Sequence, residues 1–165
     1  MQSEPGRGAT FQVYLPQAKI APSVPVAPAD APPDGGHETI LLAEDESGIR
    51  AMTRAYLETM GYRVLEAADG SEAIGRSMEY NGPIHLVITD LIMPGIRGDS
   101  AVKAIRTQRP FIKAILMTGY ADQDLAQMPE SILHKPFELP ELGRRVRTVL
   151  DARAGETGHH LDPAA

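Results

Sequence analysis

The feature that most constrains this chain is a short apolar run that ends in a single acid. The run covers residues 84–89 (IHLVIT), and Asp90 follows it directly. Its β-branched residues favour a strand that is buried on both faces, as in a parallel sheet. Pro94, Gly95 and Gly98 then break the regular pattern. Because open α/β sheets bind their ligands beyond the carboxyl ends of the strands, Asp90 is predicted to lie at a functional edge.

Strand-like and helix-like segments alternate on both sides of this run. Four further strands are expected, at residues 39–43, 62–67, 111–117 and 131–134. Helices are expected at residues 47–60, 70–80, 99–109, 122–127 and 138–153. In the first helix we expect Ser47 as the N-cap and an apolar face that carries Ile49, Met52 and Tyr56. The alternation predicts a doubly wound α/β fold, in which helices cover both faces of a five-stranded parallel sheet.

Three segments fall outside this pattern. Residues 1–16 combine a glycine turn with alternating apolar positions, which is typical of a strand. Residues 17–37 are rich in proline and alanine and are expected to form an extended linker before the domain at residues 38–152. Residues 153–165 are small and polar, and we expect them to form a flexible tail.

Composition argues against several classes of function. The chain has 165 residues, no cysteine and a formal net charge of −6. Without cysteine it can form neither disulfides nor thiolate metal sites, and without a basic stripe it is not expected to bind nucleic acid. No apolar run approaches the roughly 20 residues that span a bilayer, so we expect no direct membrane contact. Because the N-terminus lacks an apolar signal core, a cytoplasmic location is expected.

Polar residues follow four of the five expected strands. Glu44 and Asp45 follow the first strand, Asp90 the third, Thr118 the fourth and Lys135 the fifth. In a parallel sheet these ends share one edge, so the five side chains are predicted to converge. Three carboxylates repel one another unless a cation neutralises them, and oxygen ligands suit Mg²⁺. A nucleophilic aspartate with a lysine and a hydroxyl for the phosphoryl oxygens is what phosphoryl transfer requires.

Four motifs stand in order along this pattern: ILLAEDE, VITDLIMPGIRG, LMTGY and HKPFE. On these motifs, residues 38–152 resemble the receiver domain of two-component response regulators and hybrid histidine kinases. The resemblance implies a flavodoxin-like (CheY-like) sheet of strand order 2-1-3-4-5. The stretch between Thr118 and Lys135 is short for this family and contains Met128-Pro129. We therefore expect a short or frayed fourth helix.

The resemblance implies that a phosphoryl group is accepted from phosphohistidine onto Asp90. Thr118 matches the switch hydroxyl of the family, and Lys135 matches its phosphate-binding lysine. Pro136 is expected behind a cis peptide bond, as in the family. Family members often carry an aromatic residue at the position of Ile132, where it partners the switch hydroxyl. We therefore expect weak or absent aromatic switching in this chain.

The resemblance also implies a site for Mg²⁺ (or Mn²⁺). Asp45 matches the direct ligand, Asp90 shares the metal, and the backbone carbonyl of Ile92 completes the shell. Glu44 matches a second acid that usually holds metal-bound water, and it stands where Asp is commoner in the family. Ile92 and Tyr120 would flank the phosphate with apolar bulk. We expect this bulk to exclude attacking water and to lengthen the phosphoryl lifetime.

These matches predict a two-component phosphorelay receiver that changes conformation on phosphorylation. Its expected partners are a histidine kinase domain, in cis or in trans, and a histidine phosphotransfer protein. Residues 1–16 resemble the closing strand of the kinase ATP-binding domain, so the parent chain is expected to be a hybrid kinase, with a membrane anchor as one option. The receiver would catalyse its own phosphorylation and dephosphorylation, but no kinase site is expected in this fragment. The alternative is a phosphorylation-independent or partner-gated receiver that acts as a protein-interaction module.

Other functions fit the motifs less well. A phosphatase of the haloacid dehalogenase type also uses a strand-end aspartate, but it places a second acid where this chain has Ile92. A flavin-binding module would need a Ser/Thr/Gly-rich loop after the first strand, where this chain has three acids. Arg144, Arg145 and Arg147 are expected on the solvated face of the last helix.

Overall fold

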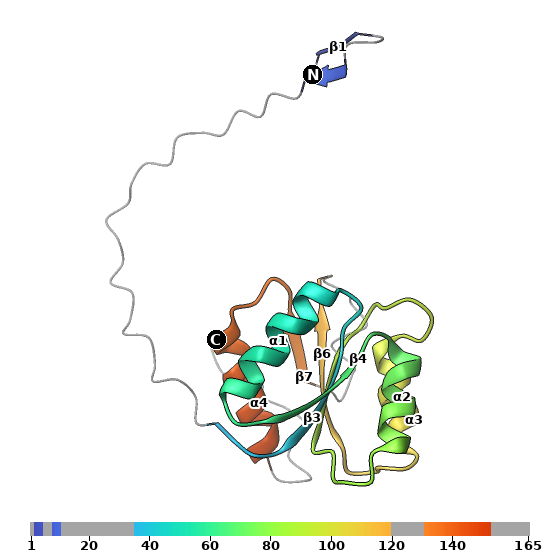
Figure 1. Ribbon diagram of the computed structural model, residues 1–165, viewed down its shortest axis with the longest axis vertical. Coiled ribbons are helices and arrows are strands. Elements are labelled where there is room, and N and C mark those ends of the chain that lie inside the picture. Colours follow the sequence, from blue (N-terminus) through green and yellow to red (C-terminus); the bar gives the residue numbers. More distant parts are fainter. Residues whose placement is uncertain (1, 5–7, 11–34, 120–130, 153–165) are drawn as a thin grey trace, which may run out of the picture. The chain divides into compact units, whose positions relative to one another are not determined.

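The computed structural model describes residues 2–4, 8–10, 35–119 and 131–152 (Figure 1). A small separate unit contains β1 (Gln2–Glu4) and β2 (Gly8–Thr10), which pair antiparallel. The strand end expected at residues 11–16, most of the linker, the helix expected at residues 122–127, Tyr120 and the tail from residue 153 lie outside the described residues.

The larger unit is built on one parallel sheet. Its strands are β3 (Thr39–Ala43), β4 (Arg63–Ala67), β5 (Leu86–Asp90), β6 (Lys113–Thr118) and β7 (Ser131–His134). They lie in the order β4-β3-β5-β6-β7, and every neighbouring pair is parallel. Numbered within the sheet this is 2-1-3-4-5, which confirms the predicted fold.

Helices cover both faces of the sheet. They are α1 (Ser47–Thr59), α2 (Gly70–Glu79), α3 (Gly98–Arg106) and α4 (Leu139–Asp151). Figure 1 shows α1 and α4 on one side of the sheet and α2 and α3 on the other. Among the described residues, none of the helices combines the length and the apolar character needed to cross a bilayer.

The core has two apolar layers because successive strand residues point to opposite faces of the sheet. The layer under α2 and α3 includes Leu41, Val87, Leu116, Ala73, Val102 and Ile105. The layer under α1 and α4 includes Ile40, Ile88, Ile115, Leu57, Leu142 and Val146. The central strands are therefore buried on both sides, as their continuous apolar sequences predict.

The first helix begins and packs differently from its prediction. Its N-cap is Glu46 rather than Ser47, and the buried residues of α1 are Thr53 and Leu57. The side chain of Met52 is 50% exposed, so its placement on the apolar face was wrong. The helix face that packs on the sheet includes the polar residue Thr53. The apolar pattern of the sequence therefore does not identify this face. Gly61, with φ of +90°, follows the helix in the left-handed conformation that glycine favours.

Arg109 lies beyond the end of α3. This helix was predicted to reach residue 109 but ends at Arg106. The Arg109 guanidinium turns back and donates hydrogen bonds to the carbonyl oxygens of Ser77 (3.0 Å), Tyr80 (2.6 Å) and Gly82 (3.0 Å). The Ser77 and Tyr80 carbonyls lie at the end of α2, where helix geometry leaves them without partners, and Gly82 follows in the next loop. Arg109 therefore ties the ends of α2 and α3 together, a role that no sequence motif indicated.

Arg147 is also not the solvated side chain that its helix position suggested. Its guanidinium donates to Glu38 Oε1 (2.9 Å), Asp151 Oδ1 (2.6 Å) and the Tyr62 hydroxyl (3.4 Å). The side chain is only 22% exposed. It joins α4 to the residue that precedes β3, because the start of that strand lies beside the helix.

We expect Arg147→Met to lower the free energy of unfolding by about 2 kcal/mol at pH 7, the scale of hydrogen bonds to charged groups. Burial disfavours the Glu38 carboxylate, but the hydrogen bond and charge of Arg147 outweigh it and hold the pKa of Glu38 below its ordinary 4.5. The contribution of the Glu38–Arg147 ion pair to the free energy of unfolding is therefore complete above pH 4.5, the ordinary pKa of Glu38. It is lost as the pH falls through the lower pKa that Glu38 has in the folded protein.

Urea unfolding at several pH values checks this prediction. The deficit of Arg147→Met relative to wild type should narrow as the pH falls from 7 towards 3. Arg144→Met is the matched control, because Arg144 lies exposed on the same helix. A deficit that stays constant with pH would contradict the assigned ion pair.

Candidate functional site

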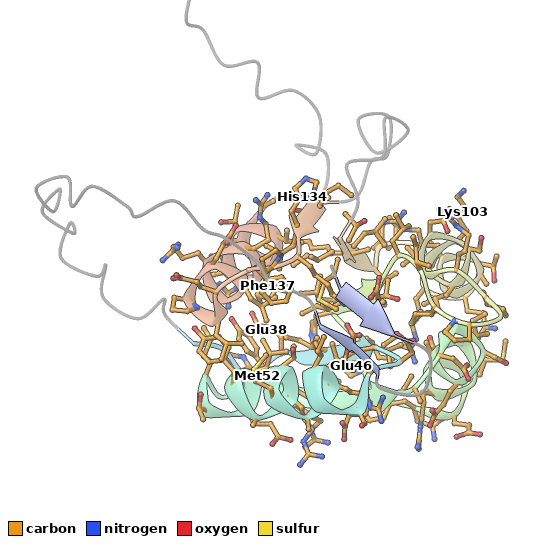
Figure 2. All side chains as sticks on the ribbon, turned by 90° about the horizontal axis from the view of Figure 1, so that it is seen from above. Glu38, Glu46, Met52, Lys103, His134 and Phe137 are labelled. Carbon is orange, nitrogen blue, oxygen red and sulfur yellow. The ribbon has the colours of Figure 1, made fainter. Side chains whose placement is uncertain are left out.

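The carboxyl ends of the strands bring the predicted residues to one edge of the sheet. In the ladders, Ala43 aligns with Thr89, Asp90 with Met117 and Thr118 with His134. The residues that end or follow β3, β5, β6 and β7 are therefore neighbours. Figure 2 is seen from above and shows Glu46 at the start of α1 and His134 at the end of β7.

Lys135 connects two of the three acids. Its Nζ lies 2.6 Å from Asp90 Oδ2 and 2.7 Å from Glu44 Oε2, and the side chain is 19% exposed. Burial disfavours the charged ammonium, but the hydrogen bonds to Asp90 and Glu44 outweigh burial and raise the pKa of Lys135. The lysine is therefore charged at neutral pH. The following bond, Lys135–Pro136, is cis, as predicted.

The three acids form a compact group of oxygen ligands. One carboxylate oxygen each from Glu44, Asp45 and Asp90 lies within 4.8 Å of the others. Glu44 is 1% exposed, and this burial raises the pKa of its carboxyl, against the effect of Lys135. Asp45 is exposed to solvent. A hard divalent cation prefers such an oxygen set, so these residues can hold a metal ion.

The loop after β5 is held against the phosphoacceptor candidate. The backbone N–H of Ile92 donates to Asp90 Oδ1 (3.0 Å), and that of Gly98 donates to the carbonyl of Leu91 (3.1 Å). A Cβ on Gly98 would lie 2.1 Å from the Asp90 carbonyl oxygen, so only glycine fits this approach without a shift. The Ile92 side chain is 49% exposed beside the site, and its expected effect on attacking water stays a prediction.

Thr118 ends β6 and is 1% exposed, and its carbonyl accepts a hydrogen bond from the Lys135 backbone N–H (2.7 Å). That bond fixes the chain that presents the lysine next to the strand that presents the threonine. Ile132, which replaces an aromatic residue common in the family, packs partly buried against the apolar layer under α2 and α3. The weak aromatic switching expected from Ile132 stays a prediction.

Arg50 belongs to this region and was missed in the sequence. Its Nη1 donates to the carbonyl oxygens of Glu44 (2.6 Å) and Asp45 (3.4 Å). An arginine near the start of an amphipathic helix is commonly an exposed side chain, and no motif distinguished this one. The available signal was its place on the first turns of a helix that directly follows the acids.

Comparison with known proteins agrees with the geometry. Residues 40–147 match the family model of the response regulator receiver domain. The sensor kinase CckA of Brucella abortus (strain 2308) is 35% identical over 162 residues, which cover 90% of this chain and 17% of CckA. The response regulator receiver protein CpdR of the same organism is 33% identical over 119 residues, covering 68% of this chain and 97% of CpdR.

Solved structures give the same result. The crystal structure of the receiver domain from the hybrid histidine kinase CckA has a TM-score of 0.60 and 36% identity, over 68% of this chain and 98% of that one. The chain therefore spans about a sixth of the length of the Brucella abortus sensor kinase, whereas its match covers nearly all of the solved receiver domain. The family match, the strand order and the clustered strand ends all agree. The chain therefore belongs to the response regulator receiver domains of two-component phosphorelay signalling.

Proposed function

We propose that this receiver accepts a phosphoryl group from the phosphohistidine of a histidine kinase onto Asp90, with Mg²⁺ held by the acidic cluster. The observation that carries this proposal is the contact of Lys135 Nζ with both Asp90 and Glu44, inside a group of three converging carboxylates. A structural ion pair would need one acid, whereas phosphoryl transfer needs a nucleophile, a cation site and a donor for phosphoryl oxygens.

In this proposal an Asp90 carboxylate oxygen attacks phosphorus. The P–O bond forms as the P–N bond to the imidazole breaks, and the imidazole nitrogen keeps the electron pair. Lys135 moves its hydrogen bond from the free carboxylate to an oxygen of the transferred group. The Thr118 hydroxyl is the second donor to that group. Since Lys135 and Thr118 sit on adjoining strand ends, both can contact one phosphoryl group.

The residues present fit a divalent cation. Glu44, Asp45 and Asp90 contribute three negative charges and Lys135 one positive charge, so the site keeps two negative charges. Asp45 and Asp90 would bind the ion directly, Glu44 through water, and the Ile92 carbonyl would complete the set. When bound, Mg²⁺ (or Mn²⁺) neutralises the acids and the phosphoryl oxygens.

We further propose that the domain is the receiver of a hybrid histidine kinase. The similarity to CckA covers 90% of this chain, which is more than the receiver match at residues 40–147. This extent supports a receiver that is joined to further sensor-kinase sequence. The assignment of residues 1–16 to the end of a kinase ATP-binding domain rests on their own resemblance to that strand. The partners would then be a kinase domain, in cis or in trans, and a histidine phosphotransfer protein, all in the cytoplasm.

Intact-mass measurement tests the proposal. Wild-type protein with Mg²⁺ and either acetyl phosphate or a phosphorylated histidine kinase domain should gain about 80 Da, the mass of one phosphoryl group. Asp90→Asn should show no gain, and EDTA should prevent the gain in wild type. If neither donor modifies wild type, the proposal is wrong and a receiver that works as an interaction module is favoured.

A further inference from the structure

The backbone that carries Glu44 and Asp45 lies beyond the sheet ladder. The β3 ladder ends at Ala43, which pairs with Ala67 and Thr89. One more bond, from the Glu44 N–H to the Ala67 carbonyl (3.2 Å), extends the pairing on one side. Glu44 and Asp45 themselves follow the last ladder pair, so their carbonyls need a donor from outside the sheet.

Arg50 supplies that donor. Its Nη1 lies 2.6 Å from the Glu44 carbonyl oxygen and 3.4 Å from that of Asp45. Its Nε lies 3.7 Å from Glu66 Oε1 on β4, so a second element also holds the guanidinium. The side chain is 19% exposed, which limits competition from water. A planar guanidinium with several donors is suited to a fixed two-point contact of this kind.

We infer that Arg50 is a positioning residue for the cation site. It holds the two carbonyls on its own side of the loop and thereby directs the carboxylates of Glu44 and Asp45 towards Asp90. This inference rests on the proposed function, because it assigns Arg50 to the same Mg²⁺ site. Groups that orient metal ligands in this way commonly change metal affinity when they are replaced, although they do not touch the ion.

Arg54 provides a matched control on the same helix. It contacts the same acid, with Nη1 2.7 Å from Glu66 Oε2, and it also pairs with Glu58 (3.5 Å). Its contacts are to side chains on α1 and β4 rather than to the backbone of the acidic loop. Replacing Arg54 therefore removes an arginine and a Glu66 contact while the carbonyl contacts of Arg50 are kept.

The experiment is a Mg²⁺ titration of unphosphorylated protein, followed by amide NMR shifts at the site, with thermal unfolding in EDTA measured in parallel. Arg50→Met should raise the Mg²⁺ dissociation constant by about tenfold, whereas Arg54→Met should leave it within about twofold of wild type. Arg50→Lys should fall between, because one ammonium replaces part of the contact. If Arg50→Met does not fold, Arg50→Lys carries the comparison, with an expected rise of about threefold.

The possible outcomes distinguish a failure of the Arg50 role from a failure of the proposed function. Equal Mg²⁺ affinities for the Arg50 and Arg54 variants, with wild type binding normally, would overturn the positioning role and leave the proposed function intact. A wild-type protein that does not bind Mg²⁺ would overturn the proposed function and this inference with it. The role would be supported if Arg50→Met binds Mg²⁺ more weakly than Arg54→Met while the two variants unfold at similar temperatures in EDTA.

Discussion

A Lys135→Met variant is expected to lose about 3–5 kcal/mol of unfolding free energy in metal-free buffer, because removing one partner leaves buried charge without compensation. Glu44 is 1% exposed and Asp90 is 15% exposed, and both carboxylates contact the same ammonium. Since a domain of this size has only about 5–15 kcal/mol in total, the variant should be close to its stability limit. We also expect its phosphorylation by acetyl phosphate to slow by roughly 100-fold, the scale for loss of one preorganised donor.

Urea unfolding in EDTA and in Mg²⁺ measures the first effect, and the rate of mass gain measures the second. Mg²⁺ should reduce the stability deficit, because a divalent cation at the acids replaces part of the lost charge. The control is Lys103→Met on α3, whose side chain is 74% exposed and 4.0 Å from Asp99 (Figure 2). The control should change stability by less than about 0.5 kcal/mol. Equal stabilities of the two variants would contradict the central role of Lys135.

A Gly98→Ala variant is expected to lose about 2–3 kcal/mol of unfolding free energy through overpacking. Its added Cβ would lie 2.1 Å from the Asp90 carbonyl oxygen and 2.8 Å from Thr89 Oγ1. Relief requires movement of the Asp90 backbone or of the start of α3. Since a displacement of about 1 Å can cost 100-fold in rate, phosphorylation at Asp90 should also slow by about that factor.

Gly75→Ala on α2 is the matched control for this prediction. A Cβ at Gly75 meets nothing within 4 Å, and alanine is the better helix former, so this variant should gain about 0.5–1 kcal/mol. Urea unfolding and the rate of mass gain again provide the measurements. If both alanine variants gained stability and kept the wild-type rate, the close approach of Gly98 to Asp90 would be refuted.

The parts of the fold that could be predicted from the sequence are those with local causes. Apolar runs such as that of β5 identify buried strands, and parallel strands must share an edge. That geometry was enough to group Glu44, Asp90 and Lys135 before any contact was known. The start of α2 also has a local cause, because the Asp69 side chain accepts a hydrogen bond from the Glu72 N–H (2.8 Å) as an N-cap.

The errors concern long side chains whose partners are distant in the sequence. Arg50, Arg109 and Arg147 were missed or assigned to solvent, yet each binds a segment that only the tertiary fold brings near. A helix pattern gives the direction of an arginine but not its partner, because the long stem can reach several neighbours. The error at Met52 has a local cause. The buried residue next to it, Thr53, is polar, so the apolar pattern assigned Met52 to the buried face of α1 instead.

The contacts of Arg147 and Lys113 set the size of the smallest fragment that should fold like the whole domain. Arg147 binds Glu38 and Asp151, and Lys113 Nζ donates to the carbonyls of Leu150 and Ala152, both at 2.7 Å. All four partners lie outside residues 40–147, the segment that matches the family model. A fragment trimmed to that match would lose these contacts and the last turn of α4. We therefore expect the smallest fragment that folds like the whole domain to extend over residues 38–152, because these side-chain contacts, and not the family match, include both of its ends.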